Sequence, residues 1–143
     1  MSTTPTPAEL TGAACLYCHA PTERVNGPTL YGRPYGGWFY RCQPCGAHVG
    51  CHPGTTAALG TVANAALRQL RQAAHQAFDP LWKARTRRGC GKAEARAKGY
   101  AWLSSRLGIA PAHTHIGLCD AAACEQVIAL CRPYSLNLLS PTI

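Results

Sequence analysis

The order of apolar and polar side chains changes character near residue 54. Before it, short apolar and aromatic runs alternate with Gly and Pro, which predicts strands around Thr29–Tyr31 and Trp38–Arg41. After it, apolar residues recur at intervals of three and four, as on one face of a helix. The pattern therefore predicts an α+β chain, with a flexible tail at 1–12, a sheet-containing module at 13–54 and a helical body at 55–143.

The helical body is predicted to be a bundle of about four helices on which the N-terminal module packs. Thr55 or Thr56 can cap the first helix, and Gly108 suits the C-terminal end of the third. Pro80 and Pro133 are expected to end helices, because the residue before a proline avoids helical geometry. In chain order, the predicted helices cover residues 55–79, a short segment opened by Pro80, 92–107 and 120–131.

Two CxxC pairs lie in the N-terminal module: "CLYC", with Cys15 and Cys18, and "CQPC", with Cys42 and Cys45. Four thiolates from two tight turns that bracket a hairpin can converge tetrahedrally on Zn²⁺. Gly46 suits the second turn because glycine tolerates positive φ. A site filled by four thiolates has no open position, so the ion would be structural. It would replace a core that about forty residues cannot build alone.

The remaining cysteines and histidines leave alternatives open. A redox dithiol is disfavoured, because neither CxxC pair opens a convincing helix. His19, Cys51 or His52 could replace one of the four thiolates. The residues that could form a second zinc site or an acid–base pair are His113, His115 and Cys119, together with His75 or His52.

Three further cysteines differ in their surroundings. Cys124 and Cys131 fall seven positions apart in the last predicted helix, in line with apolar residues, which indicates a core stripe. Cys90 lies between two glycines and near basic residues, so it is either an ordinary loop cysteine or an activated thiol.

Positive charge is concentrated in one part of the chain. Lys and Arg number 14 against 6 Asp and Glu, and such a chain is attracted to polyanions. Most of the basic residues lie between positions 68 and 98, where Asp79 and Glu94 are the acids. The alternative is a solvated face that keeps the protein in solution. The predicted nucleic-acid contacts are Arg68, Arg71, Arg85, Arg87, Arg88, Lys92 and Arg96.

The chain carries no recognisable export or membrane signal. Its start, "MSTTPTPAELTG", has neither a basic n-region nor an apolar run. No stretch approaches the roughly 18 apolar residues that a membrane span needs. An odd count of 9 cysteines fits a disulfide framework poorly. A cytoplasmic location is therefore expected.

Several motifs in combination resemble the small "zinc-finger-containing" proteins of phages, prophages and related mobile elements, a family of unknown function. They are "CLYC", "YGGWFYRC", "CGAHVGCHPGT", "AHQAFDPLW" and "HIG", spread from about Cys15 to Cys131. The resemblance implies a zinc-bound N-terminal ribbon, with Cys15, Cys18, Cys42 and Cys45 at the matching positions. It also implies an accessory protein rather than a housekeeping enzyme. The segment "RTRRGCGK" is not part of the pattern, so the resemblance says nothing of Cys90.

Three functions are compatible with these features. The first is a small zinc-stabilised binding protein that contacts DNA or RNA through phosphates. The second is an adaptor or inhibitor that acts on a host protein. The third is a metal-assisted nuclease using His52, His75 and His115, although 6 acidic residues are few for two-metal chemistry. The chain is therefore more plausibly a binding protein than an enzyme, and its oligomeric state is left open.

Overall fold

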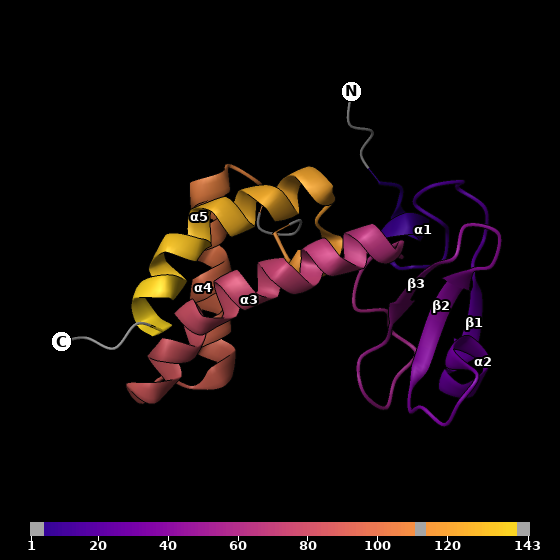
Figure 1. Cartoon of the computed structure of the whole chain (residues 1–143), viewed down its shortest axis with the longest axis horizontal. Helices are drawn as coiled ribbons and strands as arrows, with labels where there is room; N and C mark the ends of the chain where they lie inside the picture. The colour runs from indigo at the N-terminus through magenta and orange to yellow at the C-terminus, as the bar shows by residue number, and fades with distance from the viewer. Residues whose placement is uncertain (1–4, 111–113, 140–143) are drawn as a thin grey trace. The chain divides into compact units, whose positions relative to one another are not determined.

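A computed structural model describes residues 5–110 and 114–139 (Figure 1). The chain divides into two compact units, Met1–Arg68 and Gln69–Ile143. The elements in chain order are α1 (Pro7–Leu10), β1 (Glu23–Asn26), α2 (Gly27–Tyr31), β2 (Trp38–Cys42), β3 (Ala47–Gly50), α3 (Ala65–Arg87), α4 (Lys92–Leu107), the 3₁₀ turn η2 (Ile116–Leu118) and α5 (Ala121–Leu139). A small antiparallel sheet followed by helices confirms the predicted α+β class.

The N-terminal unit contains a three-stranded antiparallel sheet in the order β1-β2-β3. Val25 pairs with Phe39 across β1 and β2, and Tyr40 pairs with Val49 across β2 and β3. The strand predicted around Trp38–Arg41 is confirmed as the central strand, β2.

The strand predicted at Thr29–Tyr31 is wrong, because these residues lie in helix α2. The Asn26 side chain accepts a hydrogen bond from the Thr29 N–H at 2.9 Å, which caps the helix. Pro28 fits the first helical turn, and Gly32 ends the helix with φ 69°. These local capping signals outweigh the apolar alternation that suggested a strand.

The first long helix begins ten residues later than the sequence pattern predicts. His48 and Ala63 exchange backbone hydrogen bonds of 3.0 and 2.9 Å, so the segment before the helix pairs with β3 instead of coiling. Helix α3 starts only at Ala65, where the Asn64 side chain caps it by accepting from the Leu67 N–H at 2.9 Å. This pairing places residues 55–68 with the N-terminal unit rather than with a helical body.

The tail predicted at 1–12 is ordered in part. Thr6 and Glu9 form a capping box at the start of α1, with each side chain bonded to the other's backbone N–H. Glu9 is buried and its carboxylate lies 3.4 Å from the His19 ring. Residues 7–10 therefore form a helix rather than a flexible segment.

The described chain after the sheet forms three long helices, α3, α4 and α5, and the short 3₁₀ turn η2, in agreement with the predicted group of about four helices. Helix α3 continues through Pro80 and α5 through Pro133, so both predicted stops are wrong. An internal proline costs about 3 kcal/mol, and burial on both sides offsets that cost in α3: Phe78 is fully buried and Trp82 nearly so. Helix α4 matches the predicted 92–107, and Gly108 ends it with φ 67°.

The core of the C-terminal unit is apolar and closely packed. Its largest fully buried side chains include Phe78, Leu103, Ile116 and Val127. Cys124 and Cys131 are also fully buried, which confirms the predicted core stripe, and burial raises the pKa of the Cys131 thiol to about 11. None of the described helices combines the length and apolar character that crossing a membrane requires.

Candidate metal centre

The two CxxC segments fold into matching turns. The His19 N–H donates to the Cys15 carbonyl, and the Gly46 N–H donates to the Cys42 carbonyl, both at 2.9 Å. His19 and Gly46 hold the same position after their pairs, and both have positive φ, 66° and 72°. The backbone thus turns back identically at both sites, and each turn directs two sulfur atoms to one side.

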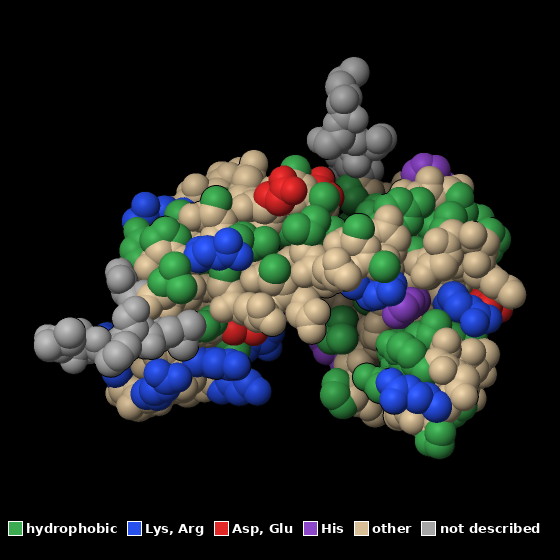
Figure 2. All heavy atoms as spheres, in the orientation of Figure 1, with side chains coloured by type: hydrophobic (Ala, Val, Ile, Leu, Met, Phe, Trp, Pro, Cys, Tyr) green, Lys and Arg blue, Asp and Glu red, His purple; other side chains and the backbone are tan. Residues whose placement is uncertain are grey.

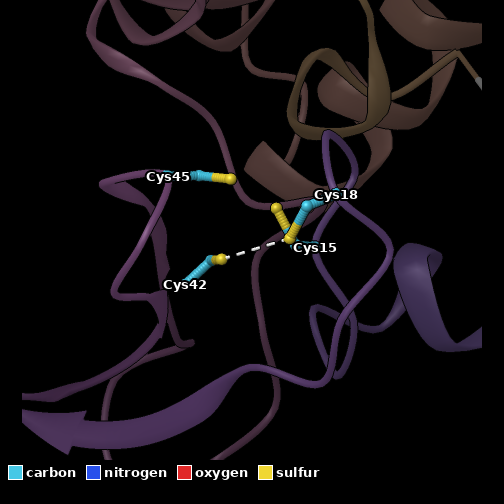
Figure 3. A group of neighbouring side chains, drawn as sticks. All are labelled: Cys15, Cys18, Cys42 and Cys45. Carbon is cyan, nitrogen blue, oxygen red and sulfur yellow. Dashed lines mark hydrogen bonds between the residues drawn. The ribbon is translucent and has the colours of Figure 1, made fainter.

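The four sulfur atoms face a common centre from these two turns (Figure 3). All lie within 4.8 Å of one another, and the Cys18 and Cys42 sulfurs, joined by the dashed line, are 3.6 Å apart. Four sulfurs held at about 2.3 Å from a tetrahedral Zn²⁺ ion lie about 3.8 Å from each other. The spacing therefore fits a zinc ion without rearrangement of the backbone.

Hydrogen bonds within the cluster link the protonation of its thiols. The Tyr17 N–H donates to the Cys15 sulfur at 3.4 Å. The Ala20 N–H, followed by the Cys42 and Cys45 thiols, lowers the pKa of Cys18 to about 7. Hydrogen bonds to Cys18 and Cys42 raise the pKa of Cys45 to about 12. The lowered pKa of Cys18 and the raised pKa of Cys45 show that these two thiols compete for one negative charge, whereas a divalent ion would bind all four cysteines as thiolates.

The site is continuous with the small core of the N-terminal unit. Cys15 and Cys42 are buried, whereas Cys18 and Cys45 are exposed, so the centre is closed on its inner side. The buried cluster around it consists of Cys15, Cys42, Ala47 and Val62, with Leu16, Tyr40 and Val49 packed against it. Two members of so small a core are the ligands themselves, which makes the metal part of the folding energy.

Comparison with known families agrees with this geometry. The profile of the DUF3268 family, described as a zinc-finger-containing domain, matches residues 11–134. The chain belongs to this family. Its four clustered cysteines provide the site for one structural Zn²⁺ ion, which confirms the predicted cofactor. Neither a curated protein nor a solved structure matches the chain.

The alternative ligands lie apart from this centre. Among the described residues, the four cysteines are the one group of three or more candidate ligands close enough to share an ion. His19 contacts Glu9 instead, at 3.4 Å. Cys51 pairs through its backbone with Ala58, and the His52 N–H donates to the Ala57 carbonyl at 2.9 Å. None of the three joins the sulfur cluster.

The other histidines that the structure describes do not converge on a catalytic or second metal site. The His75 ring lies 3.3 Å from the Asp79 carboxylate, and the His115 ring stacks on Tyr100 with centroids 4.5 Å apart. His113 lies outside the described residues. Since the described residues hold no second cluster of ligands, the metal-assisted nuclease gains no metal site from the structure.

Two of the seven predicted nucleic-acid contacts have structural roles. Arg71 is buried, and its Nε and Nη2 donate to the Cys119 carbonyl at 3.1 and 3.0 Å. The prediction that Arg71 contacts phosphate is wrong, because a buried guanidinium is not accessible to a polyanion. Arg68 donates to the Ala63 carbonyl at 2.7 Å and lies 3.2 Å from the His48 ring.

His48 is the side chain whose role the sequence did not reveal. It lies in β3, half-buried beside the rings of Tyr31 and Phe39. Burial, followed by the Arg68 charge, lowers the pKa of His48. It is therefore a neutral packing residue that helps to anchor Arg68.

The five remaining basic residues form an exposed set. They lie at the end of α3, in the turn after it and on the first half of α4, where Figure 2 shows Lys and Arg side chains gathered. They are Arg85, Arg87, Arg88, Lys92 and Arg96. We refer to residues 85–96 as the basic turn.

Proposed function

We propose that this zinc-finger-containing protein binds DNA or RNA through phosphate contacts made by the basic turn. The main support for this proposal is that five exposed cationic side chains lie in this turn, where Glu94 is the sole acidic residue. Glu94 itself pairs with Lys98 at 3.0 Å. A dense positive surface on rigid helices favours a polyanion over an isolated carboxylate.

The backbone of the basic turn adds to this preference. Gly89 has φ 94°, which lets the chain reverse sharply between α3 and α4. Helix α4 begins after Gly91 without a side-chain cap, so its first N–H groups are available to an anion. The positive end of the helix dipole therefore lies within the same basic surface.

The proposed setting is that of a phage or mobile-element accessory protein acting in the cytoplasm. The accessory role rests on the resemblance of motifs such as "YGGWFYRC" and "CGAHVGCHPGT" to phage and prophage proteins. The cytoplasm rests on the zinc site, because four thiolates persist best in a reducing compartment.

A fluorescence anisotropy titration with labelled duplex and single-stranded oligonucleotides tests the proposal. Replacing Arg85, Arg87 and Arg88 together by Gln should weaken binding strongly at low salt. For duplex DNA, the slope of log affinity against log salt should become shallower by up to about 2.7, because each phosphate contact contributes about 0.9. No binding at low salt by the zinc-loaded wild type would refute the proposal.

A matched control removes the same charge elsewhere. Arg24, Arg33 and Arg132 are exposed and lie outside the basic turn. Their joint replacement by Gln should leave the salt slope nearly unchanged. An equal loss in both triple variants would show that net charge, rather than the basic turn, governs binding.

A protein partner is a second candidate, favoured by exposed aromatic residues in the N-terminal unit. Tyr31, Tyr35 and Trp38 are between 40 and 49% exposed, and aromatic side chains of this kind are enriched at protein interfaces. A host protein that co-purifies after nuclease treatment, and is lost in Trp38→Ala and Tyr35→Ala, would support an adaptor or inhibitor.

A further inference from the structure

A pocket of about 220 Å³ opens on the C-terminal unit, among helices α3, α4 and α5. Its wall residues come from positions 78–85 of α3, 98–106 of α4 and Tyr134 of α5. Ligand pockets for drug-sized molecules measure roughly 300–1,000 Å³. This pocket is therefore suited to one ring system rather than to a peptide or a large cofactor.

Aromatic side chains form much of the wall. Phe78 and Trp82 are buried and fixed, and the Trp82 Nε1–H donates to the Asp79 carboxylate at 3.0 Å. Trp102 and Tyr134 form the accessible side, with their rings edge to face at 5.8 Å and 89°. Tyr134 is 46% exposed, so a flat ligand can reach these rings from solvent.

Positive charges surround the aromatic wall. Arg85, Lys98 and Arg106 line the pocket, and no acidic residue is among its lining residues. The Arg106 guanidinium lies over the Trp102 ring, 5.6 Å from its centroid. Lys98 pairs with Glu94, but the pair is exposed, and exposed pairs contribute little. An anion can therefore displace Glu94 at small cost.

We infer that this pocket binds a single nucleotide, its base against Trp102 and Tyr134 and its phosphate at Arg85, Lys98 and Arg106. Aromatic side chains stack on any base, and arginine recognises phosphate through its planar fork. Bases in a duplex are stacked and paired, so they cannot enter without being extruded. The source of the nucleotide is either a single strand or a free mononucleotide.

The inference deepens the proposed function, because Arg85 belongs to both the basic turn and the pocket. The basic turn and the pocket recognise different parts of a nucleic acid. The basic turn recognises phosphate alone, whereas the pocket requires a base. An oligonucleotide that keeps its phosphates but lacks bases separates the two.

The experiment uses the zinc-loaded full chain and three labelled probes in anisotropy titrations. They are a single-stranded oligonucleotide, an oligonucleotide of equal length with abasic central positions, and a duplex of the same sequence. The intact single strand should bind on the order of tenfold more tightly than the abasic one. Trp102→Ala should abolish this difference and leave duplex binding unchanged.

Two further variants keep the test independent of folding. Tyr134→Ala removes an exposed ring and should reduce the base-dependent gain, whereas Trp102→Phe should retain most of it. Trp38→Ala, in the N-terminal unit, is the matched control and should have no effect on the gain. Thermal melts of each variant show whether the C-terminal unit remains folded.

Adenosine monophosphate, titrated by isothermal calorimetry, distinguishes the two sources. Binding that Trp102→Ala and Arg106→Gln both weaken identifies a free nucleotide as a sufficient ligand, whereas base-dependent binding of the strand alone identifies a polymer. The inference is overturned if intact and abasic strands bind equally and the monophosphate does not bind. In that case, continued binding that depends on the basic turn leaves the proposed function standing. If none of the probes binds, both the proposed function and the nucleotide pocket are refuted.

Discussion

The two units of this chain obtain their order by different means. In the N-terminal unit two of the four residues in the buried cluster are the zinc ligands Cys15 and Cys42. In the C-terminal unit Phe78, Leu103 and Ile116 are fully buried among long helices. The chain therefore uses a metal where its sequence supplies too little apolar surface for a core.

Removing the metal should have the largest effect and should affect the N-terminal unit alone. Chelation, or Cys42→Ser, is expected to unfold strands β1–β3, because structural zinc contributes about 10–16 kcal/mol in zinc-finger peptides. Helices α4 and α5 should persist. Hydrogen exchange read residue by residue measures both effects.

The control for this experiment is Cys90→Ser, a cysteine outside the metal cluster. It should leave exchange protection in both units unchanged. Protection in β2 that survives complete zinc removal would contradict the contrast between the units, and so would equal loss of protection in α4.

The second prediction concerns the C-terminal unit. Arg71→Met should destabilise it by about 2 kcal/mol, because the buried Cys119 carbonyl loses two charged donors. Zinc content and the salt slope of nucleic-acid binding should not change. Thermal unfolding followed by the ellipticity of the helices measures the loss.

Arg71→Lys sharpens this prediction, because lysine keeps the charge but cannot reproduce the planar two-nitrogen contact. It should be intermediate in stability. If either Arg71 variant had normal stability but bound nucleic acid poorly, Arg71 would instead be a phosphate contact.

The third prediction is a pH dependence in the same unit. Burial alone would raise the pKa of Asp79, but hydrogen bonds from His75 and Trp82 outweigh it and lower the pKa below its ordinary value. The resulting stabilisation is present above the unfolded-state pKa of about 3.9 and is lost as the pH falls through the lower folded-state pKa.

Asp79→Asn should therefore cost about 1 to 2 kcal/mol at neutral pH and progressively less in acid. Urea unfolding at several pH values measures the difference between wild type and variant. A difference that stays constant down to pH 2 would show that the Asp79 charge is not the cause.

The smallest predicted effect tests the turn geometry at the metal. His19→Gly relieves a positive φ of 66° but removes the contact with Glu9, so stability should change by less than about 1 kcal/mol. Zinc should remain bound at one ion per chain. Loss of zinc in this variant, measured by elemental analysis, would indicate that His19 is a zinc ligand.

Local signals made part of the fold predictable from the sequence. Strand β2 and helix α4 were found because alternation, a helical period and Gly108 all lie within the elements themselves. The four cysteines were found because CxxC spacing encodes a metal turn. The Gly46 turn followed from the same rule, but the equivalent turn at His19 did not, since histidine rarely takes positive φ.

Long-range contacts decided the rest and leave no trace in a local pattern. The segment before α3 has helical periodicity but pairs with β3 through His48. Pro80 looks like a stop, yet the burial of Phe78 and Trp82 keeps α3 continuous. The sequence alone suggests that Arg71 is a surface charge, because its contact with the Cys119 carbonyl joins residues far apart in the chain. The nucleotide pocket draws on three helices and could not be found from any one.

The metal content of the purified full chain shows whether the four cysteines hold one zinc ion. Elemental analysis should find one zinc per chain in the wild type and in Cys51→Ser and His52→Ala, and none in Cys42→Ser. Zinc retained by Cys42→Ser, or a fully folded N-terminal unit in a wild-type protein that contains no metal, would show that zinc bound by these cysteines does not order the N-terminal unit.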